Sequence, residues 1–111
     1  MKISVIIPVY NKDTYVRKCL QQALSQDYDD YEVIAVDDGS SDSSSAICDE
    51  MANENPRLKV IHKENGGVTA ARRTGVEEAR GQYIMFCDRE DALVSHALRH
   101  TIEAMEANDA D

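Results

Sequence analysis

Four short runs of apolar and β-branched residues recur along the chain. They are nearly continuous rather than alternating, which is typical of strands buried on both faces of a parallel sheet. The runs are Ile3–Val9, Tyr31–Val36, Leu58–His62 and Tyr83–Cys87. Each is separated from the next by a segment long enough for a helix, so the pattern predicts four strands joined by crossover connections.

The segments between and after these runs carry apolar residues at helical spacing. A candidate N-cap, Ser95, precedes the last of them. In the third segment, small residues such as Ala71 and Gly75 would let a helix lie close to a sheet. The helical stripes cover residues 16–24, 46–51, 68–79 and 98–105. The order βαβαβαβα predicts an α/β, Rossmann-like fold with a parallel sheet and right-handed crossovers.

The expected sheet order is 3-2-1-4, flanked by helices. The first two crossovers move one way from the first strand, and the fourth strand returns to its other side. Ile3–Val9 should therefore pair with Tyr83–Cys87, with a topological switch point between them. Ligands of open α/β sheets bind at the carboxyl ends of the strands near such a point.

Composition limits the classes of function. The chain has 111 residues, which suits one domain over residues 1–111, and a net charge of −9. The acidic balance argues against direct nucleic-acid binding, which needs basic patches. There is no run of about 18 apolar residues, so no transmembrane helix is expected. Three scattered cysteines indicate reduced thiols in a cytosolic protein rather than a disulfide framework.

Polar residues follow the first two predicted strands. Pro8-Val9-Tyr10 ends the first, where proline would turn the chain, and Asp37-Asp38 followed by Gly39-Ser40 ends the second. The two carboxylates would accept hydrogen bonds from a base or a ribose. The alternative is an Asp-Gly turn, with Ser40–Ser45 supplying caps to the next helix.

The third connection contains the paired glycines Gly66-Gly67. Glycines allow positive φ and close backbone approach, and the helix that follows could face a phosphate with its N-terminus. Arg72 in that helix could reach a diphosphate, or form a surface salt bridge instead. The glycines match neither G-x-G-x-x-G nor a P-loop, which argues against a nicotinamide site and excludes P-loop chemistry.

An acidic cluster follows the fourth predicted strand, in the segment that begins at Asp88 and includes Glu90 and Asp91. Carboxylates about 4 Å apart repel one another by roughly 4 kcal/mol per pair at an effective dielectric constant of 20. Such a cluster therefore suggests a divalent cation with oxygen ligands. The alternative is a solvated acidic turn at a helix N-terminus, where acids are favoured anyway.

With these motifs in this order, the chain resembles the inverting family-2 glycosyltransferases of the GT-A fold. The matching segments are residues 6–11, 36–42, 65–72 and 81–88. The resemblance implies transfer of a sugar from a nucleoside-diphosphate donor to an acceptor hydroxyl, with inversion at the anomeric carbon. It also implies a place in polysaccharide or glycoconjugate biosynthesis.

The resemblance implies a role for each matching position. The residues implied to border the nucleoside are Pro8, Val9 and Tyr10, while Asp37 or Asp38 would hold the base, commonly uracil. Gly67 and Arg72 would lie near the nucleoside or diphosphate. The acids Asp88, Glu90 and Asp91 would hold Mn²⁺ or Mg²⁺ against the diphosphate, where the metal acts as a Lewis acid.

Enzymes of this family continue beyond the length of this chain, into an acceptor site and a catalytic base. We therefore expect the donor-binding portion of a truncated glycosyltransferase, catalytically silent by itself, and assign no catalytic base. The expected partners are a UDP-sugar, a second copy of the chain and, in the full-length protein, an acceptor glycan or lipid-linked glycan. The expected location is the cytoplasm, including the inner face of the membrane. The alternative is a non-catalytic module that binds a nucleotide or a protein partner.

Overall fold

The computed structural model describes residues 2–87 and residue 103. Within this range four strands and three helices alternate as the sequence predicts. They are β1 (Ile3–Val9), α1 (Val16–Leu24), β2 (Tyr31–Asp38), α2 (Ser44–Glu54), β3 (Leu58–Lys63), α3 (Val68–Glu78) and β4 (Tyr83–Phe86). The strand β2 continues two residues further than expected, through Asp37 and Asp38. The fourth predicted helix, with its cap Ser95, falls outside the described residues.

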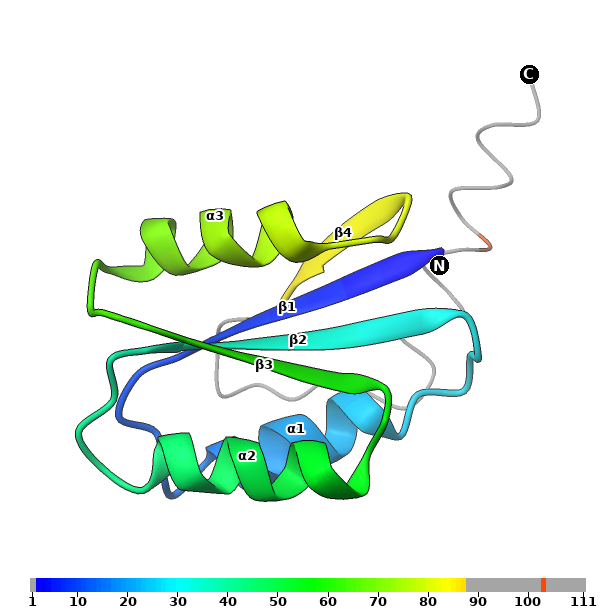
Figure 1. Cartoon of the computed structure of the whole chain (residues 1–111). Coiled ribbons are helices and arrows are strands. Elements are labelled where there is room, and N and C mark those ends of the chain that lie inside the picture. Colours follow the sequence, from blue (N-terminus) through cyan, green and yellow to red (C-terminus); the bar gives the residue numbers. More distant parts are fainter. Residues whose placement is uncertain (1, 88–102, 104–111) are drawn as a thin grey trace.

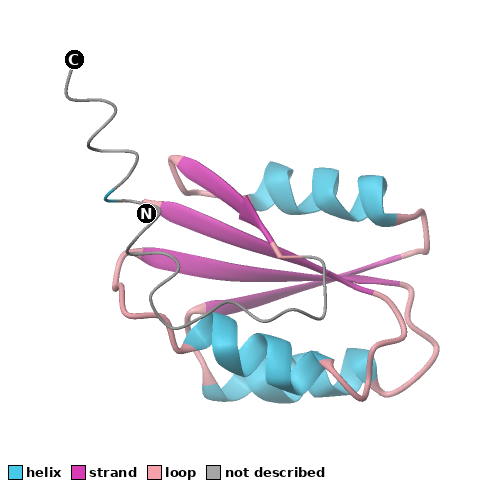
Figure 2. Ribbon diagram, turned by 180° about the vertical axis from the view of Figure 1, so that it is seen from behind, coloured by secondary structure: helices cyan, strands magenta, loops and turns pink. Residues whose placement is uncertain are grey.

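The four strands form one parallel sheet in the order β3-β2-β1-β4, which confirms the predicted topology. Ile3–Ile6 of β1 pairs with Tyr83–Phe86 of β4 in register. The helices α1 and α2 cover one face of the sheet and α3 covers the other (Figures 1 and 2). Within residues 2–87, no helix has the length and apolar character needed to cross a membrane.

The central strands β1 and β2 are buried at every position, as their continuous apolar runs predict. The edge strands β3 and β4 are not, so the expectation of burial on both faces is wrong for them. On β4, Ile84 and Phe86 lie opposite Ser4 and Ile6 of β1 and are 36% and 44% exposed. The cause is the placement of α3, which packs mainly on β1 and β2 and less on the sheet edge.

Alternation along the central strands divides the core into two layers. Odd-numbered residues of β1, such as Val5 and Ile7, pack with Leu20 of α1 and Met51 of α2. The even-numbered face packs against α3, where an ideal Cβ built on Gly75 would lie 2.5 Å from Cγ2 of Ile6. The small residues of α3 therefore let the helix lie close to the sheet, as predicted.

Pro8 lies inside β1, opposite Val36 of β2, rather than at a turn. The carbonyl of Ile6 accepts a hydrogen bond from the backbone N–H of Cys87, so even-numbered residues of β1 direct their backbone groups toward β4. Among the described residues, the pairing of β1 with β4 runs as far as Ile6 and Phe86. Pro8 faces the β4 side beyond that last described pair, so its missing N–H interrupts no described ladder hydrogen bond.

A histidine at the end of β3 links the sheet to α2. His62 lies opposite Asp37 in register. Its Nδ1 is 2.9 Å from Oδ2 of Asp37, and its Nε2 is 2.7 Å from Oδ1 of Asp49 on α2. Hydrogen bonds to the carboxylates of Asp37 and then Asp49 raise the pKa of His62 above its ordinary value. The His62 ring thus joins β2, β3 and α2.

Replacing Gly75 with alanine should destabilise the fold. Alanine gains about 1 kcal/mol of helix propensity over glycine, but overpacking a filled core costs about 1–3 kcal/mol. The clash with buried Ile6 should win, so urea unfolding should show a lower free energy of unfolding for Gly75→Ala. Glu77→Ala, at an exposed position of the same helix, is the control. A more stable Gly75→Ala protein would contradict this packing.

Stability should fall with rising pH because of His62. Its pKa is near 6.5 when unfolded and higher in the fold, so its contribution is complete below about pH 6.5 and is lost as pH rises through the folded value. Thermal unfolding from about pH 5.5 to about pH 8.5 should show a declining midpoint. The midpoint of His62→Gln should decline less. Taking the difference between the two proteins cancels the contribution of the other histidines to the pH dependence. Equal slopes would show that His62 does not contribute.

Candidate functional site

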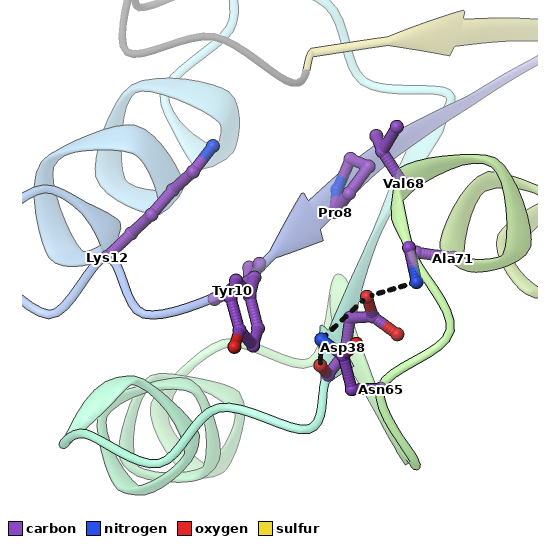
Figure 3. Close-up of a pocket in the computed structure, with 9 residues that line it drawn as sticks. Pro8, Tyr10, Lys12, Asp38, Asn65, Val68 and Ala71 are labelled. Atoms are coloured by element: carbon purple, nitrogen blue, oxygen red, sulfur yellow. Dashed lines mark hydrogen bonds between the residues drawn. The ribbon is translucent and has the colours of Figure 1, made fainter.

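The carboxyl ends of β1, β2 and β3 meet at one edge of the sheet and border a pocket (Figure 3). Its volume is about 380 Å³, within the range of small-molecule sites. The N-terminus of α3 closes it on one side. The lining residues are Pro8, Val9, Tyr10, Lys12, Asp38, Asn65, Gly67, Val68 and Ala71. The pocket thus lies at the strand ends, where the sequence predicts a ligand.

The carboxylate of Asp38 is the most heavily hydrogen-bonded group in this pocket. Its Oδ1 accepts from Nζ of Lys63 and from the backbone N–H of Gly66, both at 2.9 Å. Its Oδ2 accepts from the backbone N–H of Gly67 at 3.0 Å, with Nδ2 of Asn65 at 3.4 Å. Asp38 is only 3% exposed. A side chain at the end of β2 therefore fixes the connection between β3 and α3.

The charge of Asp38 is maintained by these donors. Burial raises the pKa of the carboxyl, but the hydrogen bonds from Lys63, Gly66 and Gly67 and the positive charge of Lys63 lower it by more. The net shift is downward, so the group is ionised at neutral pH. An ionised carboxylate accepts hydrogen bonds and donates none.

Asp37 and Asp38 point to opposite faces of the sheet, because successive side chains of a strand alternate. Asp37 lies on the α2 side, where its Oδ1 accepts from the backbone N–H of Ser40 at 3.1 Å and its Oδ2 contacts His62. Asp37 does not line the pocket. Of the two acids that the sequence left open for the base, the structure brings only Asp38 beside Pro8 and Tyr10.

The glycines at this edge have the backbone conformations that their residue type permits. Gly67, the residue before α3, has φ of 94°, and Gly39 has φ of 72° with an ideal Cβ only 2.7 Å from the backbone nitrogen of Asn65. The predicted positive φ is found at Gly67 but not at Gly66, and the close backbone contact lies at Gly39. The N–H groups of Gly66 and Gly67, which precede the helix N-terminus expected to face a phosphate, are bonded to Asp38.

Asn11 links the loop after β1 to the loop after β2. It has φ of 48°, which asparagine tolerates better than most residues. Its Oδ1 accepts from the backbone N–H of Ser41 at 2.8 Å, and its own N–H donates to Oγ of Ser40 at 3.1 Å. Ser43, the N-cap of α2, makes no side-chain capping bond, so these serines fix the loop that follows Tyr10 rather than capping the helix.

Arg72 lies on α3 outside the set of residues that line the pocket. Its guanidinium carbon is 5.4 Å from the centre of the Phe86 ring on β4, a cation–π contact. Phe86 is two residues before Asp88 in the sequence. Arg72 is therefore directed toward the end of β4, from which the acidic segment continues.

The predicted metal ligands Asp88, Glu90 and Asp91 lie outside the described residues. Among residues 2–87 and residue 103, no group of three histidine, cysteine or acidic side chains could hold a metal ion. Sequence reasoning also missed Lys63, Asn65, Lys12 and Asn11. The polar residues after β1 and β3 indicated that loops follow these strands, but they did not indicate which side chains of those loops would form contacts at the site.

Known proteins are similar to this chain in sequence and in fold. The chain is 38% identical over 109 residues to the uncharacterized glycosyltransferase EpsJ of Bacillus subtilis, covering 98% of this chain and 32% of EpsJ. It matches S. aureus TarS 1–349 in complex with UDP-GlcNAc with a TM-score of 0.87 and 31% identity, over 96% of this chain and 32% of that one. It also matches the mannosyltransferase PcManGT of Pyrobaculum calidifontis in complex with GDP-Man and Mn²⁺. The TM-score is 0.70 and the identity 27%, and the match covers 75% of this chain and 26% of PcManGT.

The chain spans about a third of the length of EpsJ and of the TarS fragment. The family described as glycosyl transferase family 2 matches residues 4–111, nearly the whole sequence. The sheet order, the pocket at the strand ends and the motifs that line it agree with that match. The chain therefore belongs to glycosyl transferase family 2.

Proposed function

We propose that this chain forms the donor-binding part of an inverting glycosyltransferase that uses a UDP-sugar. The observation that carries the proposal is the ionised carboxylate of Asp38, held by four donors inside a pocket at the carboxyl ends of β1 and β2. TarS, whose corresponding region has the same fold, was crystallised with UDP and with UDP-GlcNAc. That similarity supports a uridine nucleotide as the ligand.

In this proposal the pocket holds the nucleoside. The half-exposed ring of Tyr10 offers a flat apolar surface for a base, and Pro8, Val9 and Val68 supply the apolar walls. Asp38 accepts the hydrogen bond of a base N–H. Gly67 at the start of α3 leaves room beside the ribose, because no atom lies within 4 Å of the Cβ it lacks.

The diphosphate and the metal belong at the end of β4. Three carboxylates within four residues, Asp88, Glu90 and Asp91, are a donor set that suits Mn²⁺ or Mg²⁺. PcManGT, a more distant structural relative, was solved with Mn²⁺. A bound ion would neutralise the departing diphosphate. Arg72, directed toward Phe86, would add positive charge on the same side.

The whole reaction needs more protein than this chain. The chain spans about a third of EpsJ, so we propose that the acceptor glycan or lipid-linked glycan and the catalytic base belong to the rest of a longer enzyme, in the cytoplasm or peripherally at the inner face of the membrane. The isolated 111 residues are then silent in sugar transfer. Exposed Ile84 and Phe86 offer apolar surface for self-association. The alternative function is a module that binds a nucleotide or a protein partner without chemistry.

Calorimetry with UDP tests the proposal. We expect UDP to bind in the presence of Mn²⁺ and to bind more weakly in chelator, because the acids repel the diphosphate unless an ion lies between them. GDP and CDP under the same conditions measure the preference for the base.

Equal binding in chelator would remove the metal from the proposal, and a preference for GDP would remove uracil. No binding of any of the three nucleotides would overturn the donor site itself. Sugar transfer or donor hydrolysis by the purified chain would contradict its proposed silence and exclude the non-catalytic alternative.

Two tyrosines of similar exposure provide a matched test of the base site. Tyr10 lines the pocket at 49% exposure, whereas Tyr15 precedes α1 outside it at 45%. Stacking of a base on an aromatic ring contributes about 1–3 kcal/mol. Tyr10→Ala should therefore weaken UDP binding by about tenfold or more with little change in unfolding temperature, and Tyr15→Ala should leave both unchanged. Equal effects of the two substitutions would show that Tyr10 does not contact the base.

A further inference from the structure

Two consecutive acids at the end of β2 face two consecutive basic residues at the end of β3. Asp37 is paired with His62 and Asp38 with Lys63, and strand alternation sends the two pairs to opposite faces of the sheet. Asp38 and Lys63 form the pair on the pocket side. Nζ of Lys63 donates to Oδ1 of Asp38 at 2.9 Å and to the carbonyl of Glu64 at 2.6 Å.

This pair differs from the other lysine and arginine pairs of the described residues. The side chains of Lys63 and Asp38 are 21% and 5% exposed. Those of Lys59 and Glu78 are 45% and 48% exposed, and those of Arg17 and Glu50 are similar. Exposed pairs contribute little to stability. Removing one partner of a buried pair leaves an uncompensated charge, so the state of Asp38 depends on Lys63.

The hydrogen bonds of Asp38 leave one acceptor position for a ligand. A carboxylate oxygen accepts about two hydrogen bonds, and Oδ1 already has Lys63 and Gly66 at 2.9 Å. Oδ2 has one good donor, the N–H of Gly67 at 3.0 Å, and a long contact of 3.4 Å with Asn65. An incoming N–H group would displace only that long contact, since Nδ2 of Asn65 keeps its 3.0 Å bond to the carbonyl of Asp38.

We propose that Lys63 is a positioning residue that determines base selectivity, because it keeps Asp38 ionised and turned so that Oδ2 accepts from the ligand. A charged acceptor at this point suits a base that presents a ring N–H, as uracil does. It opposes cytosine, whose equivalent ring nitrogen is itself an acceptor. This inference rests on the proposed function, since it assumes that the pocket holds a pyrimidine nucleotide.

Loss of Lys63 should change what Asp38 can recognise. Burial raises the pKa of Asp38, and without the lysine the donors that lower it are the N–H groups of Gly66 and Gly67. The other titratable side chains that line the pocket are Tyr10 and Lys12. A carboxyl that takes up a proton becomes a donor through its O–H and matches the cytosine ring nitrogen. The preference for UDP over CDP should then shrink.

The first experiment measures the dissociation constants of UDP and CDP for Lys63→Met and Lys63→Arg by calorimetry. In Lys63→Met the ratio of the CDP constant to the UDP constant should fall about tenfold, mainly through weaker UDP binding. Lys63→Arg keeps the charge and should retain most of the ratio. Lys59→Met is the matched control: it is a lysine of the same strand, paired with Glu78 on α3, and should change neither constant.

The second experiment needs no nucleotide. A ¹³C NMR titration of the Asp38 carboxyl should show a higher midpoint in Lys63→Met than in the unaltered chain, with Lys63→Arg close to the latter. Thermal unfolding checks that each variant is folded; Lys63→Gln replaces Lys63→Met if the latter is not.

Each outcome decides a separate point. An unaltered chain that binds UDP, with the same UDP preference in Lys63→Met, overturns this inference and leaves the proposed function intact. An unchanged Asp38 midpoint overturns it as well. A chain that binds neither nucleotide overturns the proposed function together with the selectivity that rests on it.

Discussion

The carboxylate of Asp38 joins three separate parts of the chain at one point. It ends β2, receives Lys63 from the end of β3, and accepts the backbone N–H groups of Gly66 and Gly67 ahead of α3. A buried carboxylate without donors would be costly, so the surrounding chain is arranged to supply them. The connection between β3 and α3 therefore takes its shape from this one side chain. The pocket, in turn, takes one wall from that connection.

The position of the pocket depends on how closely α3 lies to the sheet. Gly75 lets the helix approach Ile6, so the N-terminal turn of α3 with Val68 and Ala71 comes over the end of β1. Pro8 lies in β1 two residues beyond its last described pair with β4. These two local features, a missing side chain and a missing donor, place an apolar surface between β1 and α3. Asp38 then supplies the charged group on that surface.

Much of this architecture follows from the sequence because hydrophobic runs and crossover rules fix the strands and their order. The choice between Asp37 and Asp38 does not, since it depends on which face of β2 is covered by α3. The role of Lys63 depends on the register of β2 against β3, which joins residues 25 positions apart. The role of Asn11 depends on its positive φ, which the neighbouring sequence does not predict. Burial of β3 and β4 was overestimated because a run of apolar residues does not show how far the helices cover a strand, even where the predicted order places that strand at an edge.

The hydrogen bonds of Asp38 also bear on where a diphosphate would lie. If the N–H groups of Gly66 and Gly67 turned toward a phosphate, Asp38 would lose two donors at 2.9 and 3.0 Å while still buried. Hydrogen bonds to charged groups are worth about 1.5–3 kcal/mol each, so that rearrangement would cancel much of what the phosphate gained. A base N–H at Oδ2 replaces only a 3.4 Å contact. The balance favours a base at Asp38 and a diphosphate directed away from the glycines, toward Arg72 and the end of β4.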